Sequence, residues 1–390
     1  MLHKLKRIDG IIVTLLLLLM TLSIFIVYSA TIDDSFINVS VWKSVTFCLI
    51  GIAAFLVVSL IDYRWLLKWI WYPYGVATVL LVLVMKFASK INGATGWFSL
   101  PGGLQFQPAE LMKLVLILAL AHWLGRRQGE PLGLARDLFP AGIITFLPFV
   151  IVLMHPDLGN AIIYIVILVG ILWIANIRIS HALAITLIIG GILFTGIYIY
   201  VQFHDQINDF LNPILKEVGI SHWLQRIDTF LFPDKASHNA SFQSVNAIQA
   251  IGSGGLTGEG YLQGTSIHSN FIPLAYSDSI FVIIGEEFGF RGSALLLILY
   301  FVLIYRMILI AIQCKNKAGS YLVIGVVSMF VFQIFQNIGM MIGVMPITGI
   351  TLPFISYGGT SLMINMLSMG LVMSVQLHPT RLGDEEYMGD

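Results

Sequence analysis

IIVTLLLLLMTLSIFIVY (Ile11–Tyr28) is the stretch of sequence that decides the fold. It contains no charged residue and approaches the roughly 20 mostly apolar residues that a helix needs to cross a bilayer. No convincing small-residue cleavage site follows it, so we expect a retained first helix and not a signal peptide. The same criterion, applied outward along the chain, predicts ten membrane helices, at about 10–29, 41–61, 66–85, 107–124, 138–154, 158–175, 182–201, 279–304, 320–342 and 353–376.

The composition agrees with a membrane protein. The 390 residues are 57% hydrophobic and 11% charged, whereas soluble domains carry roughly 25% charged residues. We therefore predict an all-α polytopic membrane protein that forms a single integral membrane domain over residues 1–390. The net charge is zero, so the charge indicates no nucleic acid or other charged polymer as a partner. Cys48 and Cys314 are far apart and are expected to lie toward opposite membrane faces, so they suggest neither a disulfide nor a metal site.

The distribution of basic residues predicts the orientation, because short cytoplasmic loops are enriched in Lys and Arg. With the N-terminus in the cytoplasm, most of the basic residues fall on the inner side: Lys4, Lys6, Arg7, Arg64, Lys68, Arg126, Arg127, Arg136, Arg178, Arg306, Lys315, Lys317 and Arg381. Both termini are then cytoplasmic. Two long loops face outward, one at about 86–106, which contains Trp97, and a larger one at about 202–278, between the seventh and eighth helices. Long loops are often functional, so we expect the chemistry on the outer face.

Charged residues inside the predicted helices mark candidate sites, because an unpaired charge in lipid costs at least about 2.5 kcal/mol. Glu110 and Lys113 are three residues apart and can pair on one helix face. They form either a structural ion pair or the wall of a cavity that meets a charged headgroup. Asp157 follows a Pro at a turn between helices, where it can cap the sixth helix and also face such a cavity.

The segment Ile248–Arg291 holds the remaining candidates. Its glycine run includes Gly254 and Gly255 but lacks the Lys-Ser/Thr of a phosphate loop. The run is either a flexible turn or a place where the backbone approaches a substrate closely. Glu286 and Glu287 are too far along the eighth helix to form a close pair of carboxylates with Asp278, at about 12 Å for an ideal helix.

Asp278 lies where an outer loop becomes the eighth helix. It or Ser277 can simply cap that helix. Alternatively, Asp278 is a general base, because a carboxylate at the lipid boundary is partly desolvated and its pKa rises toward a useful value.

Six motifs give the chain a recognisable resemblance that extends over most of its length. They are FQPAELMKL (Phe106–Leu114), HPDLGNA (His155–Ala161), AIGSGGLTGEG (Ala250–Gly260), NFIPLAYSDSIF (Asn270–Phe281), IGEEFGF (Ile284–Phe290) and NIGMMIGVMPITGITLPFISYGGTSL (Asn337–Leu362). With these motifs the sequence resembles the SEDS family (shape, elongation, division and sporulation) of peptidoglycan polymerases. The short tails and the opening RIDGIIVTLLLL (Arg7–Leu18) look more like RodA than FtsW.

The resemblance implies a glycosyltransferase of the bacterial cell (inner) membrane with its active site on the outer face. The implied substrate is lipid II, a disaccharide-pentapeptide on an undecaprenyl pyrophosphate carrier, and the implied partner is a class B penicillin-binding protein. The family's essential aspartate matches Asp278, which would deprotonate the acceptor hydroxyl in an inverting transfer. Lys113, oriented by Glu110, and Lys43 are the candidates that stabilise the leaving pyrophosphate, with a divalent cation (Mg or Mn) as an alternative. Asp157, Trp97, Gly254, Gly255 and Ser277 complete the predicted substrate site.

The chain departs from the family's PExHTD pattern, since Leu274, Tyr276 and Ser277 stand before Asp278. Two rival functions therefore stay open. A lipid-linked-substrate transporter or flippase would also show many helices, intramembrane charges and an interrupted eighth segment. A non-catalytic scaffold that recruits cell-wall enzymes would tolerate the altered residues.

Overall fold

The structure is a computed structural model. It describes residues 8–32, 41–87, 89–91, 94–100, 104–155, 157–218, 221–232, 238–269, 271–272 and 275–379. Residues 1–7 and 380–390 lie outside this part of the chain, as does Leu274. The predicted cytoplasmic placement of the two termini therefore stays a prediction.

Within the described residues, eight helices are long and apolar enough to cross a membrane: α2 (Gly10–Thr31), α3 (Val41–Leu60), α6 (Pro108–Gly125), η1 with α7 (Leu134–Leu138 and Phe139–Leu153), α9 (Ile179–Gln202), α14 (Ile280–Gln313), α15 (Lys317–Met341) and α16 (Gly359–Leu377). Two further apolar helices, α5 (Trp71–Phe87) and α8 (Leu158–Ile174), have 17 residues each. All ten predicted segments coincide with an apolar helix. The helical membrane fold is confirmed, and the number of crossings stays a prediction.

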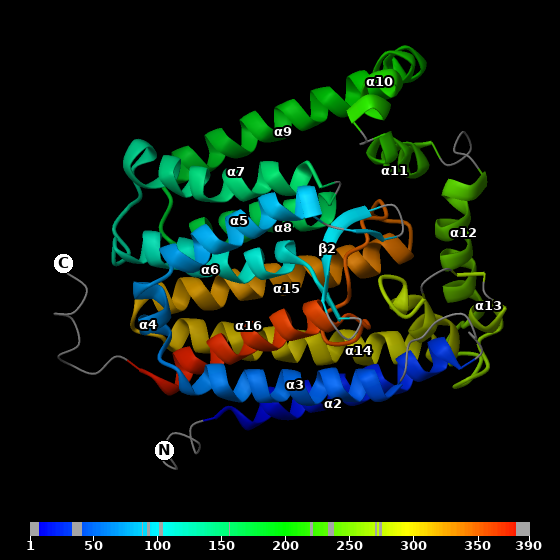
Figure 1. Ribbon diagram of the computed structural model, residues 1–390, viewed down its shortest axis with the longest axis horizontal. Helices are drawn as coiled ribbons and strands as arrows, with labels where there is room; N and C mark the ends of the chain where they lie inside the picture. Colours follow the sequence, from blue (N-terminus) through cyan, green and yellow to red (C-terminus); the bar gives the residue numbers. More distant parts are fainter. Residues whose placement is uncertain are drawn as a thin grey trace.

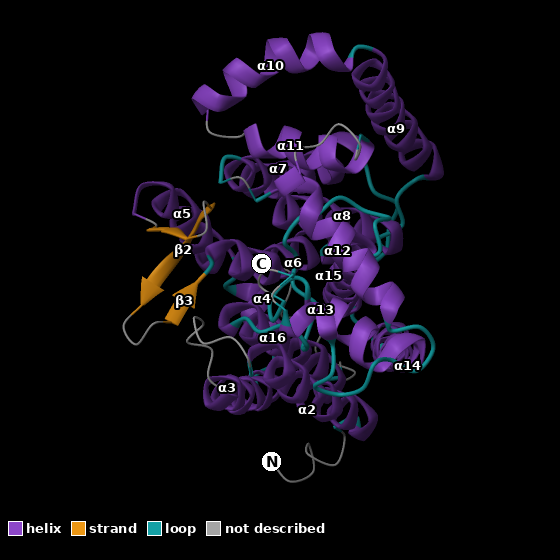
Figure 2. Ribbon diagram, turned by 90° about the vertical axis from the view of Figure 1, so that its right-hand side faces the viewer, coloured by secondary structure: helices purple, strands orange, loops and turns teal. Residues whose placement is uncertain are grey.

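The long helices run side by side, and α2 begins and α16 ends at the same end of the bundle (Figure 1). The opposite end of the bundle carries the two segments that were predicted to be long loops. Both contain regular secondary structure, and Figure 2 views the molecule from this end. The first contains an antiparallel sheet in the order β1-β2-β3 (Ser89–Ile91, Ala94–Leu100 and Leu104–Phe106). The second contains α10 (His204–Val218), α11 (Ser221–Leu231), α12 (His238–Ser253) and α13 (Thr265–His268).

Helices α6 and α15 form the centre of the bundle, where nearly every residue of α6 is buried. Small residues let the central helices approach closely, as is usual in membranes. A methyl group at Gly325 of α15 would lie 2.8 Å from Ile117 of α6. At Gly170 of α8 it would lie 1.9 Å from Ser328 Oγ of α15. A side chain of one helix thus packs directly on a glycine of the next, which sets the spacing of α6, α8 and α15.

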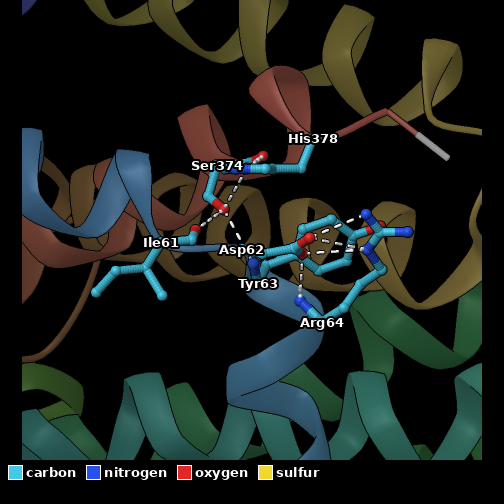
Figure 3. Close-up of polar contacts among 6 residues, drawn as sticks. All are labelled: Ile61, Asp62, Tyr63, Arg64, Ser374 and His378. Carbon is cyan, nitrogen blue, oxygen red and sulfur yellow. Dashed lines mark hydrogen bonds and ion pairs between the residues drawn. The ribbon is translucent and has the colours of Figure 1, made fainter. Parts of the chain in front are cut away.

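The third predicted membrane helix begins later than expected, because a short helix, α4 (Tyr63–Lys68), precedes it. Asp62 caps α4 by accepting from the Arg64 backbone N–H at 3.0 Å. Ser374 of α16 donates to Ile61 O and accepts from Tyr63 N, so this turn is fastened to the end of α16 (Figure 3). The span therefore begins at Trp71 and not at residue 66.

Two further predicted boundaries, the end of the eighth helix and the start of the tenth, also need correction. The eighth helix continues past residue 304 to Gln313, and its Arg306 pairs with Asp9, which caps α2. The tenth begins at Gly359 and not at residue 353, because the preceding residues form a turn in which Ser356 Oγ accepts from Leu352 N. That turn faces the candidate site.

Candidate active site

Asp278 lies in the turn before α14, partly exposed, at the end of the bundle that carries the sheet and α10 to α13. Its position is set by Asn337 of α15, which is fully buried. Asn337 Nδ2 donates to Asp278 O and to Ile350 O, both at 2.7 Å. One side chain thus joins the start of α14 to the segment between α15 and α16.

That segment supplies the surroundings of the carboxylate. Gly349 has a φ of +77°, and a Cβ there would lie 3.8 Å from Asp278 Oδ2. The Tyr357 N–H donates to Tyr276 O at 2.9 Å, and the two tyrosine rings meet edge to face with centroids 5.8 Å apart. The departure from the family pattern at Tyr276 is thus packed against the long, specific C-terminal motif.

Arg226 of α11 is the residue at this site that the sequence analysis missed. It is half-buried, its Nη1 donates to Thr348 O at 3.3 Å, and it interacts electrostatically with both Asp157 and Asp278. Burial lowers the pKa of the guanidinium, and the two carboxylates oppose that shift. The signal in the sequence that could have identified Arg226 is its position, as a single Arg, within the strongly amphipathic α11.

Asp157 caps α8 as predicted, since its Oδ1 accepts from Asn160 N at 3.0 Å. Its Oδ2 accepts from Asn160 Nδ2 at 2.8 Å and from Gln107 Nε2 at 2.9 Å. The interaction with Arg226 adds to these contacts. Asp157 therefore serves as a helix cap and shares Arg226 with Asp278 as an electrostatic partner.

Burial controls the protonation of Asp278. Desolvation raises the pKa of its carboxyl, while backbone N–H groups of Asp278 and Ser279 and the charge of Arg226 pull it back. A general base works best when its pKa approaches the working pH, so the direction of this shift suits proton abstraction.

Glu110 and Lys113 pair as predicted, with Lys113 Nζ and Glu110 Oε1 at 2.7 Å. Lys113 is fully buried, and Glu110 is 6% exposed. The contact between Lys113 and a substrate stays a prediction, and it would need a rearrangement that uncovers the ammonium group.

The glycine run approaches the backbone of α14. A Cβ at Gly254 would lie 2.0 Å from Gly285 O. The N–H groups of Glu259 and Gly260 donate to Glu286 O and Glu287 O at 2.9 and 3.1 Å. These bonds lie where α14 is interrupted by Gly289, which has non-helical angles. The close approach predicted for glycine is therefore made to a broken helix, and substrate contact by Gly254 and Gly255 stays a prediction.

The acidic pair of α14 holds the same region together. Glu286 Oε1 accepts from Ser266 N at 2.7 Å, and Glu287 Oε1 accepts from Ser29 Oγ of α2. Both carboxylates thus bind structural partners and form no dyad with Asp278.

Three other predicted site residues lie around this end of the bundle. Trp97 is in β2, opposite Ser89, and a Cβ on the neighbouring Gly96 would lie 4.0 Å from Gln107 Nε2. Lys43 is exposed in the first turn of α3, one helical turn before Phe47, whose ring meets that of Tyr357. Ser277 is half-buried beside Asp278. Binding of substrate by these residues stays a prediction.

In the described part of the chain, no group of three or more His, Cys, Asp or Glu residues could hold a metal ion. The dependence on Mg or Mn stays a prediction.

We predict that two glycines of the run differ in how much stability they lose on substitution by Ala. Gly258 has a φ of +82°, and its Cβ would lie 2.0 Å from Glu287 O, whereas Gly255 has a φ of +50° and open space. Gly255→Ala should therefore cost about 1–2 kcal/mol, the strain of a left-handed residue that carries a Cβ, and Gly258→Ala clearly more because its Cβ also meets the backbone of α14. Thermal unfolding of the purified variants measures both. Equal losses would contradict the close packing of the glycine run against the backbone of α14.

Comparison with known proteins shows which family has this arrangement. Residues 7–381 match the sequence profile of the family described as cell cycle proteins, FtsW, RodA and SpoVE. The chain is 32% identical to stage V sporulation protein E of Bacillus subtilis, over 94% of this chain and 96% of the relative. It is 30% identical to peptidoglycan glycosyltransferase MrdB of Escherichia coli K12, over 95% and 94%.

A solved structure has the same architecture. It is reported under "Structural coordination of polymerization and crosslinking by a peptidoglycan synthase complex", with a TM-score of 0.73 and 27% identity over 95% of this chain and 97% of that one. The relatives include sporulation and glycosyltransferase members, so the RodA-like assignment stays a prediction. The extent of these matches shows that this integral membrane protein belongs to the FtsW/RodA/SpoVE family of cell cycle proteins.

Proposed function

We propose that the protein is a peptidoglycan polymerase that joins lipid II units into β-1,4 glycan strands on the outer face of the bacterial cell membrane. The observation that carries the proposal is the electrostatic interaction between Asp278, a desolvated carboxylate in the turn before α14, and the half-buried Arg226, which contacts Thr348 O. The names of relatives such as MrdB support the same activity.

The reaction uses one base. Asp278 takes the proton from the 4-hydroxyl of the acceptor N-acetylglucosamine, and that oxygen attacks the anomeric carbon of the donor N-acetylmuramic acid. The bond from this carbon to the pyrophosphate oxygen breaks, undecaprenyl pyrophosphate leaves, and the configuration inverts. Pyrophosphate is a good leaving group, so the transition state needs positive charge more than a second acid.

Arg226 fits the charge requirement better than Lys113 does. It is half-buried next to Asp278 and Asp157, whereas Lys113 is enclosed in its ion pair. A partly desolvated guanidinium binds phosphate oxygens through two parallel hydrogen bonds. Arg226 would therefore stabilise the leaving group and at the same time hold the carboxylate of Asp278 ionised.

We propose a class B penicillin-binding protein as the partner. The support is the solved structural neighbour, which belongs to a peptidoglycan synthase complex that coordinates polymerization and crosslinking.

The test uses purified protein in proteoliposomes supplied with lipid II, with and without a candidate transpeptidase, and separates glycan polymers on a gel. Polymer formation that increases with the partner is expected. Absence of polymer both with and without the transpeptidase would overturn the proposal that the protein is a peptidoglycan polymerase.

A flippase is the second candidate, because the break in α14 at Gly289 resembles the discontinuous helices of transporters. The same proteoliposomes distinguish it. Headgroup translocation without polymer favours the flippase, and complementation of a depleted strain by a protein that neither polymerises nor translocates favours the scaffold.

We predict that Arg226→Gln slows polymerisation by about 10²-fold, the usual cost of removing one charge-stabilising group. The positive charge of Arg226 lowers the pKa of Asp278. Without it that pKa rises, the base is protonated at higher pH, and the acidic limb of the rate profile moves to higher pH. A pH–rate profile of both proteins measures the shift, and an unchanged limb would remove Arg226 from the site.

A further inference from the structure

Asp228 of α11 joins three consecutive helices. Its carboxylate accepts from Tyr200 Oη at the end of α9, from His204 Nε2 at 3.0 Å and from Asn208 Nδ2 at 3.2 Å, both in α10. Hence one carboxylate binds the end of α9 and the first two turns of α10 to α11.

Aromatic packing encloses these hydrogen bonds. The rings of His204 and Phe232 have centroids 4.3 Å apart, and the Tyr200 ring lies 5.5 Å from His204 and 6.4 Å from Phe232. The side chains of His204 and Asp228 are 11% and 20% exposed. We call these five residues, Tyr200, His204, Asn208, Asp228 and Phe232, the Asp228 junction.

Helix α9 has no buried residue and lies along the outer edge of the bundle (Figure 1). Nevertheless α11 carries Arg226, whose Nη1 reaches Thr348 O beside the site. The Asp228 junction is thus one of the contacts that set the orientation of α11, besides those of α11 with α12 and of Arg226 with Thr348.

Arg226 and Asp228 are two residues apart on α11. At 3.6 residues per turn they point about 200° apart, to nearly opposite sides of the helix. One side carries Asp228 and binds the junction. The other carries Arg226, which contacts Thr348 O and interacts electrostatically with Asp157 and Asp278.

We propose that Asp228 is a positioning residue for the transfer reaction: it holds α11 against α9 and α10 so that Arg226 points at Asp278. This inference rests on the proposed function, which places Arg226 and Asp278 in the reaction. Asp228 itself touches no reacting group and acts through Arg226. Its removal would leave α11 folded but free to shift relative to Thr348.

The test is a double-mutant cycle on lipid II polymerisation with Asp228→Ala, Arg226→Gln and the combined variant. We expect Asp228→Ala to lower the rate about tenfold and to move the acidic limb to higher pH, in the same direction as Arg226→Gln. We expect the combined variant to be no slower than Arg226→Gln alone, because residues that act through one another are not additive. Asp209→Ala, which removes an exposed carboxylate of α10 next to Asn208, should leave rate and profile unchanged.

Two results would overturn the inference: an unchanged rate for Asp228→Ala, or an additive loss with an unmoved acidic limb, which would show a purely structural role. If Arg226→Gln itself has no effect, the assignment of Arg226 under the proposed function fails as well. Should Asp228→Ala fail to fold, Tyr200→Phe decides, because it keeps the ring and removes one hydrogen bond to Asp228. It should shift the acidic limb in the same direction by less, and no shift would count against the inference.

Discussion

Asp278→Asn is expected to reduce lipid II polymerisation by about 10²–10⁴-fold, the usual contribution of a general base. The amide keeps the size of the side chain and leaves intact the hydrogen bond from Asn337 to the Asp278 carbonyl oxygen. It cannot accept a proton at neutral pH, so only the chemistry is removed. Single-turnover polymer formation in proteoliposomes measures the loss.

The matched control is Asp209→Asn, which removes an exposed carboxylate from α10 at the same end of the molecule. It should polymerise at the normal rate. Equal thermal stability of wild type, Asp278→Asn and the control would show that the loss is not unfolding. Normal polymerisation by Asp278→Asn would disprove the general-base role, and complementation of a depleted strain by an inactive Asp278→Asn protein would favour the scaffold.

The pH dependence separates a base from a helix cap. Desolvation raises the pKa of Asp278, so the base form is lost as the pH falls through a value above that of an ordinary Asp. The wild-type rate should therefore fall on the acidic side at a higher pH than a solvent-exposed aspartate would give. A cap that acts only on stability would change the unfolding temperature and leave the rate profile of the folded protein unmoved.

Apolar length predicted much of this fold from sequence, because a membrane helix is specified locally. The ten segments and the cap at Asp157 each depend on residues within one or two turns. The corrections involve tertiary partners as well as local turns. The α4 turn is fastened by Ser374, and the chain before α16 is held by Tyr276 and Asn337. No local pattern contains those contacts.

The sequence predicted a residue of the site only where a single local motif contains that residue. Asp278 stands at a loop-to-helix boundary that the sequence shows directly. Arg226 is 52 residues earlier in the chain. It reaches the site only because the chain folds back through α9, α10 and α11. The glycine run misled in a different way. Its small residues do indicate close approach, but the sequence does not reveal that the partner is the backbone of α14.

Lys113→Met is expected to destabilise the protein by about 3–5 kcal/mol, the cost of leaving a buried charge without its partner. Lys113 Nζ donates to Glu110 Oε1, and Glu110 Oε2 has no hydrogen-bond partner among the described residues. The remaining carboxylate would therefore stand unpaired in the most enclosed helix of the bundle. Unfolding in detergent, followed by temperature and by denaturant, measures the loss, and a variant as stable as wild type would contradict the pairing.

Combining Lys113→Met with Glu110→Gln removes both charges and should recover most of the stability, because an uncharged buried pair carries no large desolvation cost. This double variant then separates the two interpretations of the pair. Lys113 has no exposed surface, so we expect the double variant to polymerise lipid II at close to the wild-type rate, as a purely structural pair requires. A folded but inactive double variant would instead mean that Lys113 reaches the pyrophosphate of the substrate after a rearrangement, and that Arg226 does not neutralise the leaving group alone.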